Sequence, residues 1–189
     1  MSIDFTAKRP IYPAEYMMKL TQILAIAITL TLSFAVLANS QYQAPKAFIS
    51  QAFNAPTPKA KVFWLDDEAL KVIEEILSHK YKKLRVRYWQ QEGETVWILD
   101  EIGKESPITV GIHVKEKQIA QTKVLIYRES RGDEVRHDFF TDQFKAAKLN
   151  KDLTLDRHID GITGATLSVR ALTKLSRIAL WLDSRVTRS

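Results

Sequence analysis

Cysteine is absent from the 189 residues. Its absence excludes disulfide bonds, thiolate nucleophiles, cysteine-ligated zinc and iron–sulfur clusters. It does not decide the compartment, because an exported domain of this size can fold without disulfides. Glycine and proline occur six times each, which is too few for a low-complexity or fibrous chain. With 46% hydrophobic and 26% charged residues, the composition indicates a globular domain rather than wholesale disorder.

A long stripe of one charge sign is also missing. The formal net charge is +6, yet acidic and basic residues are interleaved, as in Lys115-Glu116-Lys117. Proteins that bind nucleic acids usually gather their cations on one face, so we expect no nucleic-acid partner. The small surplus suits an anionic lipid or an anionic cofactor. The four histidines show no metal-ligand spacing, and no Ser/His/Asp arrangement is evident, so we predict no metal site and no catalytic residue.

An uncharged run, Leu20–Ala38, follows Lys19 near the N-terminus. The small residues at its end favour a cleaved signal peptide. Its length of about nineteen residues also just suffices to span a bilayer core of roughly 30 Å. Both alternatives place the rest of the chain outside the cytoplasm, because the positive charge precedes the run. We therefore predict a signal peptide or membrane anchor over 1–40, a polar, proline-containing linker over 41–61, and a folded domain over 62–189.

Periodicity predicts the elements of that domain. Asp66 is the expected N-cap of a helix that ends in Lys80–Lys83. Alternating apolar residues then predict strands over 84–89, 95–102, 107–114 and 119–127. The turn residues 91–93 and 116–117 lie between neighbouring strands, which indicates an antiparallel meander.

Two further helices complete the expected fold. A short helix is predicted around Phe139, Phe140 and Phe144, and a long amphipathic helix over Leu167–Leu182. The inner side of the long helix should carry Leu167, Ala171, Leu172, Leu175, Ile178, Ala179 and Leu182. The predicted fold class is therefore α+β, an antiparallel sheet meander with packed helices, preceded by an N-terminal hydrophobic export or anchor helix.

The segment Asp160-Gly161-Ile162-Thr163-Gly164-Ala165-Thr166 lies directly before the long helix. The glycines allow positive φ and close approach of a ligand to the backbone. The unpaired amides and positive dipole end of the helix would attract an anion, above all phosphate. Thr163, Thr166 and Ser168 add hydroxyls near the same place. From the residues alone, an ordinary helix cap with a tight turn is the simpler explanation of the segment.

This segment resembles the flavinylation motif of the FMN-binding domain family, in which Asp and two variable positions precede Ser/Thr-Gly-Ala-Ser/Thr. Asp160, Thr163, Gly164, Ala165 and Thr166 fill every fixed position. The family includes the C subunit of the sodium-translocating NADH:quinone reductase and the G subunit of the RNF complex. The resemblance implies that the phosphate of FMN is esterified to Thr166. The neighbouring residues Gly161, Leu167 and Ser168 are then candidate cofactor contacts.

The resemblance extends over about residues 95–182. The segment Tyr127–Gly132 resembles the Glu-Thr-Pro-Gly loop of those subunits, except that Arg131 replaces the proline. Glu129 and Ser130 in this loop are therefore candidates for orienting the ring or ribityl groups of the flavin. A solvated loop carboxylate is the alternative interpretation of Glu129.

The resemblance implies an exported electron-transfer flavoprotein rather than a stand-alone enzyme. Its maturation would require an FAD- and magnesium-dependent flavin transferase, and its redox partner would be a membrane protein. We expect it in the periplasm, or anchored in the inner membrane with the domain facing the periplasm. Two alternatives remain: a module that binds FMN without a covalent bond or only scaffolds a redox assembly, and a small flavin reductase.

Overall fold

The structure is a computed structural model that describes Glu15, residues 41–54 and residues 56–186. Residues 40–189 form one compact unit. The predicted export segment Leu20–Ala38 lies outside the described residues. Among the helices that are described, none is long and apolar enough to cross a bilayer.

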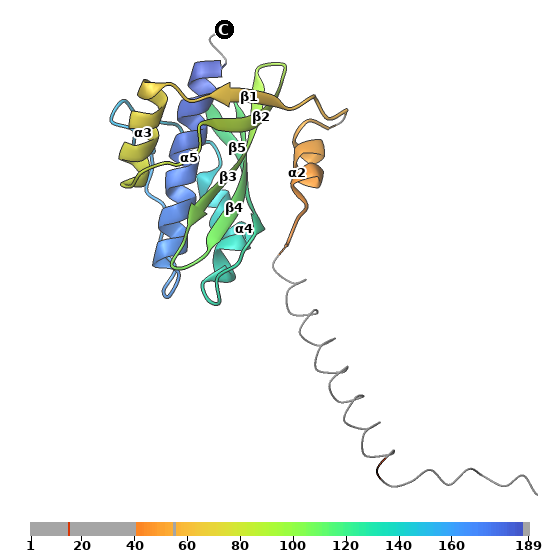
Figure 1. The fold of residues 1–189 in the computed structure, drawn as a ribbon, viewed down its shortest axis with the longest axis vertical. Helices are drawn as coiled ribbons and strands as arrows, with labels where there is room; N and C mark the ends of the chain where they lie inside the picture. The colour runs from red at the N-terminus through yellow and green to blue at the C-terminus, as the bar shows by residue number, and fades with distance from the viewer. Residues whose placement is uncertain (1–14, 16–40, 55, 187–189) are drawn as a thin grey trace, which may run out of the picture. The chain divides into compact units, whose positions relative to one another are not determined.

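Five strands form one antiparallel sheet in the order of the sequence (Figure 1). The two shorter turns contain consecutive residues with positive φ, Glu92 and Gly93 in one and Glu116 and Lys117 in the other. Such turns match the twist of the flanking strands. The predicted meander is confirmed, with one additional strand at its start. The strands are β1 (Lys61–Trp64), β2 (Arg85–Gln91), β3 (Glu94–Ile102), β4 (Pro107–Lys115) and β5 (Gln118–Ile126).

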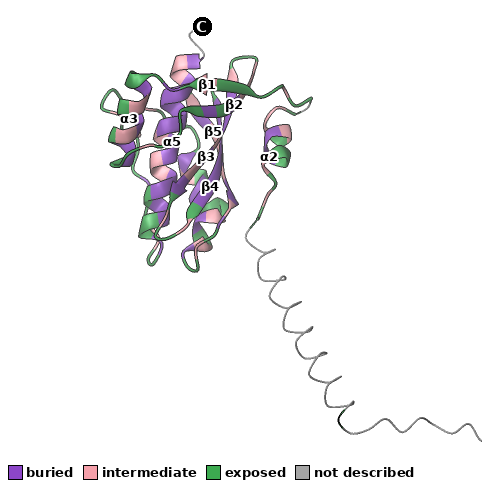
Figure 2. Ribbon diagram, viewed as in Figure 1, coloured by how far each residue is buried: buried purple, intermediate pink, exposed green. Residues whose placement is uncertain are grey.

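Helices pack on both faces of the sheet, so the fold is α+β with three layers. The larger core lies between the sheet and the helices α3 (Asp67–Leu77) and α5 (Thr166–Val186). The helix α2 (Pro45–Ala52) covers part of the opposite face. Alternation places Trp97 in the first core and Val96 in the second, and all but the two end residues of β4 are buried (Figure 2). The strand β4 is therefore the centre of the fold.

The helix α2 and the start of the strand β1 lie in the part of the chain that we predicted as a polar linker, 41–61. Pro45 is the first residue of α2, where its missing N–H costs no hydrogen bond. Phe48 is fully buried, and its ring occupies the space that a side chain at Gly111 would fill, 2.6 Å from the position of the missing Cβ. The predicted linker over 41–61 therefore contains a helix at 45–52 and the first strand residue at 61. Two adjacent buried residues are too short a signal to show in the periodicity.

The helix α3 begins as predicted and ends early. The side chain of Asp66 accepts a hydrogen bond from the amide of Ala69 at 2.8 Å, so the predicted N-cap is confirmed. Ser78 adopts φ of 62°, a left-handed C-cap that stops the helix at Leu77. Lys80–Lys83 therefore lie outside the helix, contrary to the prediction.

The remaining helices follow the prediction with one correction. The helix α4 (Asp138–Thr141) and the 3-10 turns η2 (Asp133–Arg136) and η3 (Asp142–Phe144) form the predicted short helical segment. Phe140 and Phe144 are buried in edge-to-face contact, with ring centroids 5.7 Å apart. In α5 the predicted inner residues are buried except Leu167, which is 40% exposed in the first turn. Leu167 instead borders a surface hollow.

A buried hydrogen-bond chain joins β3 to α5 and provides a stability test. The hydroxyl of Thr95 donates to Asp183 at 2.6 Å and accepts from the indole N–H of Trp97 at 2.9 Å. Replacing Thr95 by valine removes both bonds, so the free energy of unfolding should fall by about 1–3 kcal/mol in urea denaturation. Thr122→Val is the matched control, because the buried Thr122 hydroxyl has no hydrogen-bond partner in the described part of the chain. It should leave stability unchanged or raise it; equal losses in both variants would contradict the assignment.

Candidate functional site

The loop before α5 is a tight turn with a glycine where the geometry demands one. The amide of Ala165 donates to the carbonyl of Ile162 at 3.0 Å, and Gly164 has φ of 84°. A positive φ at the third position is the mark of a type II turn. Gly161 does not have positive φ, so our expectation for that glycine is wrong. Gly164 is therefore the glycine of this motif whose backbone conformation disfavours other residues.

The first turn of α5 presents unpaired amides. Its first helical hydrogen bond runs from the amide of Val169 to the carbonyl of Ala165 at 2.9 Å. In the described part of the chain, the three preceding amides, of Thr166, Leu167 and Ser168, have no acceptor. Unpaired amides and the positive end of the helix dipole together favour an anion at this position. Thr166 is exposed beside them.

A surface hollow of about 540 Å³ opens at this helix start. Its size lies within the range of small-molecule sites. The hollow brings together seven of the ten predicted site residues, and leaves Asp160, Gly161 and Thr163 outside its lining. Its lining residues are Lys104, Glu129, Ser130, Arg131, Gly164, Ala165, Thr166, Leu167 and Ser168.

Tyr127 and Gly132 hold the two sides of the hollow together. The hydroxyl of Tyr127 donates to the carbonyl of Arg131 at 2.5 Å and lies 2.9 Å from the hydroxyl of Ser168. Both side chains are buried, and burial raises the pKa of the Tyr127 phenol. Gly132 has φ of 83°, and a Cβ there would lie 3.1 Å from the Cβ of Ala165. The Ser168 hydroxyl is therefore engaged with Tyr127, which leaves its amide as the group available to a ligand.

A model of the FMN-binding domain family matches residues 103–180. The match includes every residue that lines the hollow. Residues 103–180 are an FMN-binding domain. The elements α2, β1, α3, β2 and β3 precede the matched segment, since β3 ends at Ile102. A search of the curated proteins found no match.

The hollow of the FMN-binding domain fits the cofactor that the family name implies. The open amides at the start of α5 suit the phosphate group. Lys104 and Arg131 add two cations to the lining, and Leu167 adds an exposed apolar side chain. Amides, cations and an apolar surface are the groups that a flavin phosphate and its ring system would contact.

Glu129 holds the β3–β4 loop at the edge of the FMN-binding domain's hollow. Its Oε1 accepts hydrogen bonds from three consecutive amides, of Lys104, Glu105 and Ser106, at 2.5, 2.8 and 2.9 Å. Burial raises the pKa of the Glu129 carboxyl, but these three hydrogen bonds together lower it by more, so the pKa lies below its ordinary value. The carboxylate is thus ionised at neutral pH and fixed in place.

The close approach of the Glu129 carboxylate to the β3–β4 loop requires a glycine at position 103. A Cβ on Gly103 would lie 2.8 Å from Oε1 of Glu129. Glu129 is therefore not a freely solvated carboxylate. Its Oε1 is occupied by the three amides and is not available to a ligand. Its Oε2 makes no hydrogen bond within the described residues and is the oxygen that a flavin could meet.

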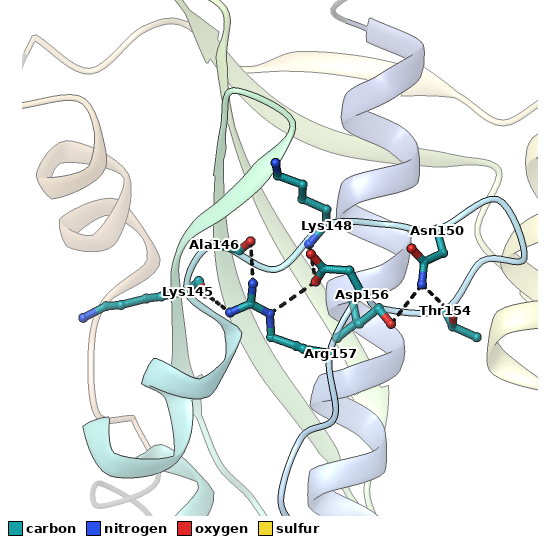
Figure 3. Close-up of polar contacts among 8 residues, drawn as sticks. Lys145, Ala146, Lys148, Asn150, Thr154, Asp156 and Arg157 are labelled. Atoms are coloured by element: carbon teal, nitrogen blue, oxygen red, sulfur yellow. Dashed lines mark hydrogen bonds and ion pairs between the residues drawn. The ribbon is translucent and has the colours of Figure 1, made fainter.

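A clasp formed by Arg157 fixes the chain just upstream of the motif (Figure 3). Its guanidinium donates to the carbonyls of Lys145 at 2.7 Å and Ala146 at 2.9 Å. Asp156 accepts from Arg157 at 3.2 Å and from the amide of Lys148 at 3.0 Å. Arg157 could not be recognised from the sequence, because no local pattern distinguishes an arginine that bonds two backbone carbonyls from an ordinary surface arginine.

Asp160 follows this clasp and projects into solvent. Its amide donates to the side chain of Gln143 at 2.7 Å. Its side chain is 85% exposed, with a carboxylate oxygen 3.7 Å from a ring nitrogen of His158. The backbone at Asp160 is therefore anchored, while its carboxylate stands outside the hollow and is accessible to another molecule.

Proposed function

We propose that the domain carries FMN covalently, through a phosphoester bond to Thr166. The observation that carries this proposal is the position of Thr166, which is exposed at the open amides of the α5 N-terminus. A phosphate esterified to its hydroxyl could accept hydrogen bonds from the amides of the same turn. The full match of Asp160–Thr166 to the flavinylation pattern supports the same residue.

The bond would be formed by a separate enzyme. A threonine hydroxyl is a weak nucleophile unless a base activates it. We propose an FAD- and magnesium-dependent flavin transferase, in which the oxygen of Thr166 attacks the FMN phosphorus of FAD. The P–O bond of the pyrophosphate breaks, AMP leaves, and the hydroxyl proton is lost to a base. The exposed carboxylate of Asp160 is available for recognition by such an enzyme, because it lies near the acceptor in the chain and outside the hollow.

The bound flavin would serve electron transfer between a membrane redox partner and an extracytoplasmic acceptor. FMN supplies the redox chemistry, and the protein supplies its position and electrostatic surroundings. The hollow lies at the surface, which would let partner proteins approach the flavin closely. Lys104 and Arg131 would add positive charge next to it.

The simplest test of attachment is the intact mass of the full chain. Coexpression with an active flavin transferase should increase the mass by one FMN minus one water, and the peptide that contains Thr166 should carry the increment. The protein should also fluoresce on a denaturing gel under ultraviolet light. An unchanged mass, under conditions in which the same transferase labels a known substrate, would refute the covalent proposal and leave reversible FMN binding as the alternative.

We further propose that the domain is exported, supported by the uncharged run Leu20–Ala38 behind Lys19. A reporter enzyme that is active only outside the cytoplasm, fused after Ser189, should therefore be active. The control fusion carries Ile28→Arg together with Leu30→Arg, which places two charges in the middle of the run and should silence the reporter. Export would be refuted if the wild-type fusion were inactive while a reporter that works only in the cytoplasm were active at the same position.

A further inference from the structure

The uncovered face of β1 and β2 combines cations with exposed apolar side chains. In the sheet register Val62 pairs with Arg87 and Trp64 pairs with Arg85, so these four residues share one face. Val86 and Tyr88 point the other way, into the larger core. Trp64 is 64% exposed and Val62 is 45% exposed. We define the basic aromatic face as Val62, Trp64, Lys83, Arg85, Arg87 and Trp89.

The positive charge of this face is only partly neutralised. Lys83 forms an ion pair with Asp100 at 3.0 Å. Within the described residues, neither Arg85 nor Arg87 forms an ion pair, and the guanidinium of Arg85 lies over the Trp64 ring at 5.4 Å from its centroid. Two exposed arginines beside a largely exposed tryptophan complement a surface that offers both anions and an apolar layer.

The basic aromatic face is hollowed. A hollow of about 510 Å³ lies between β2 and the start of α2, with Pro45 on one side and Arg85, Arg87 and Trp89 on the other. Ile98 of β3 adds to its apolar lining. The helix α2 thus covers only the neighbouring part of this side of the sheet (Figure 1).

We propose that the basic aromatic face docks on a bilayer that contains anionic phospholipids. Arg85 and Arg87 donate hydrogen bonds to headgroup phosphates, and the charge of each arginine is attracted to the anionic surface. Trp64 and Val62 enter the boundary between headgroups and acyl chains, the zone in which tryptophan is enriched in membrane proteins.

The length of the preceding chain favours a bilayer over an acidic protein. Only six residues separate Ala38, the end of the uncharged run, from Pro45, which lines the hollow. Seven residue steps of extended chain span at most roughly 25 Å. If the run enters the membrane, Pro45 must therefore stay within that distance of it. This limit on the position of Pro45 rests on the proposed export segment, whereas the chemistry of the face does not.

The test uses the full chain in vesicles with an environment-sensitive dye. Because the chain has no cysteine, Val62→Cys can be labelled at a single site. Glu75→Cys is the matched control: Glu75 is exposed and lies in α3, which packs on the opposite face of the sheet. The dye at position 62 should be quenched by lipid-attached quenchers in vesicles of phosphatidylcholine and phosphatidylglycerol. It should be quenched little in phosphatidylcholine alone, and the dye at position 75 should be quenched little in either kind of vesicle.

Substituting the arginines should undo the docking. Arg85→Gln together with Arg87→Gln should lower the ratio of docked to undocked protein by about 25-fold, at about fivefold for each charge removed. Equal quenching at positions 62 and 75, or quenching at position 62 that is unchanged by these substitutions, would overturn the proposal. Shielding of position 62 by polyglutamate without lipid, with no effect of anionic vesicles, would assign the face to an acidic protein instead. The measurement reads neither flavin nor export, so its failure is distinct from theirs.

Discussion

Replacing Thr166 by valine should abolish covalent flavin incorporation while the domain stays folded. Valine has nearly the shape of threonine but lacks the oxygen that would bond to phosphorus. Thr166 is exposed and its side chain makes no hydrogen bond within the described residues, so the free energy of unfolding should change by less than about 0.5 kcal/mol. The measurements are the intact mass after coexpression with a flavin transferase and a urea denaturation curve of the apo-protein.

Thr166→Ser is the matched control for this prediction, because it keeps a hydroxyl at the start of α5. Serine also occurs at this position of the flavinylation pattern. The serine variant should therefore still gain the mass of FMN minus water. If Thr166→Val carries the same mass increment as the wild type, Thr166 is not the acceptor. If neither the wild type nor Thr166→Val carries it and both bind FMN reversibly to the same extent, the non-covalent alternative is correct.

Replacing Gly132 by alanine should both destabilise the domain and reduce flavin loading. The φ of 83° strains any residue with a Cβ. In addition, that Cβ would lie 3.0 Å from the Tyr127 hydroxyl and 3.2 Å from the Cα of Ala165, so the loop must move away from α5. Strain and contact together should lower the free energy of unfolding by about 2–4 kcal/mol. Because the loop forms one wall of the hollow, the fraction of flavinylated protein should fall as well.

The variant Gly93→Ala separates the effect of backbone strain from the effect of the contact with Tyr127 and Ala165. Gly93 has nearly the same φ, 79°, but no atom lies within 4 Å of its missing Cβ. This variant should lose only the backbone contribution, about 1–2 kcal/mol, and should incorporate flavin normally. A Gly132→Ala protein with the same stability as Gly93→Ala and full flavin loading would show that the contact with Ala165 does not shape the site.

Most of the sheet could be predicted from local patterns, because the turns and the alternation that form its strands each involve only neighbouring residues. The positive-φ turns at Glu92-Gly93 and Glu116-Lys117 join strands whose alternation is visible over several residues. The end of α3 was less predictable, since Ser78 rather than a glycine takes the left-handed conformation. The serine gives no clear stop signal, and the lysines that follow it are favourable at the end of a helix.

In the candidate site, too, the features that are contiguous in the chain could be predicted, and the contacts between distant residues could not. The placement of Thr166 at a helix start follows from the motif and from the amphipathic segment after it, both of which are contiguous in the chain. The engagement of Ser168 by Tyr127 could not be predicted, because 41 positions separate the two residues. The hydrogen bonds from the Lys104–Ser106 amides to Glu129 likewise depend on how the β3–β4 loop and the loop after β5 pack together.

The α+β class, the antiparallel meander and the start of the last helix follow from the sequence alone, because turn chemistry and periodicity act over a few residues. The sequence alone does not show that Phe48 fills the space above Gly111, that Gly132 packs on Ala165 or that the basic aromatic face of β1 and β2 is uncovered. Each of these contacts joins segments that are distant in the chain. Their energies depend on packing and register, which no local pattern of residue types specifies.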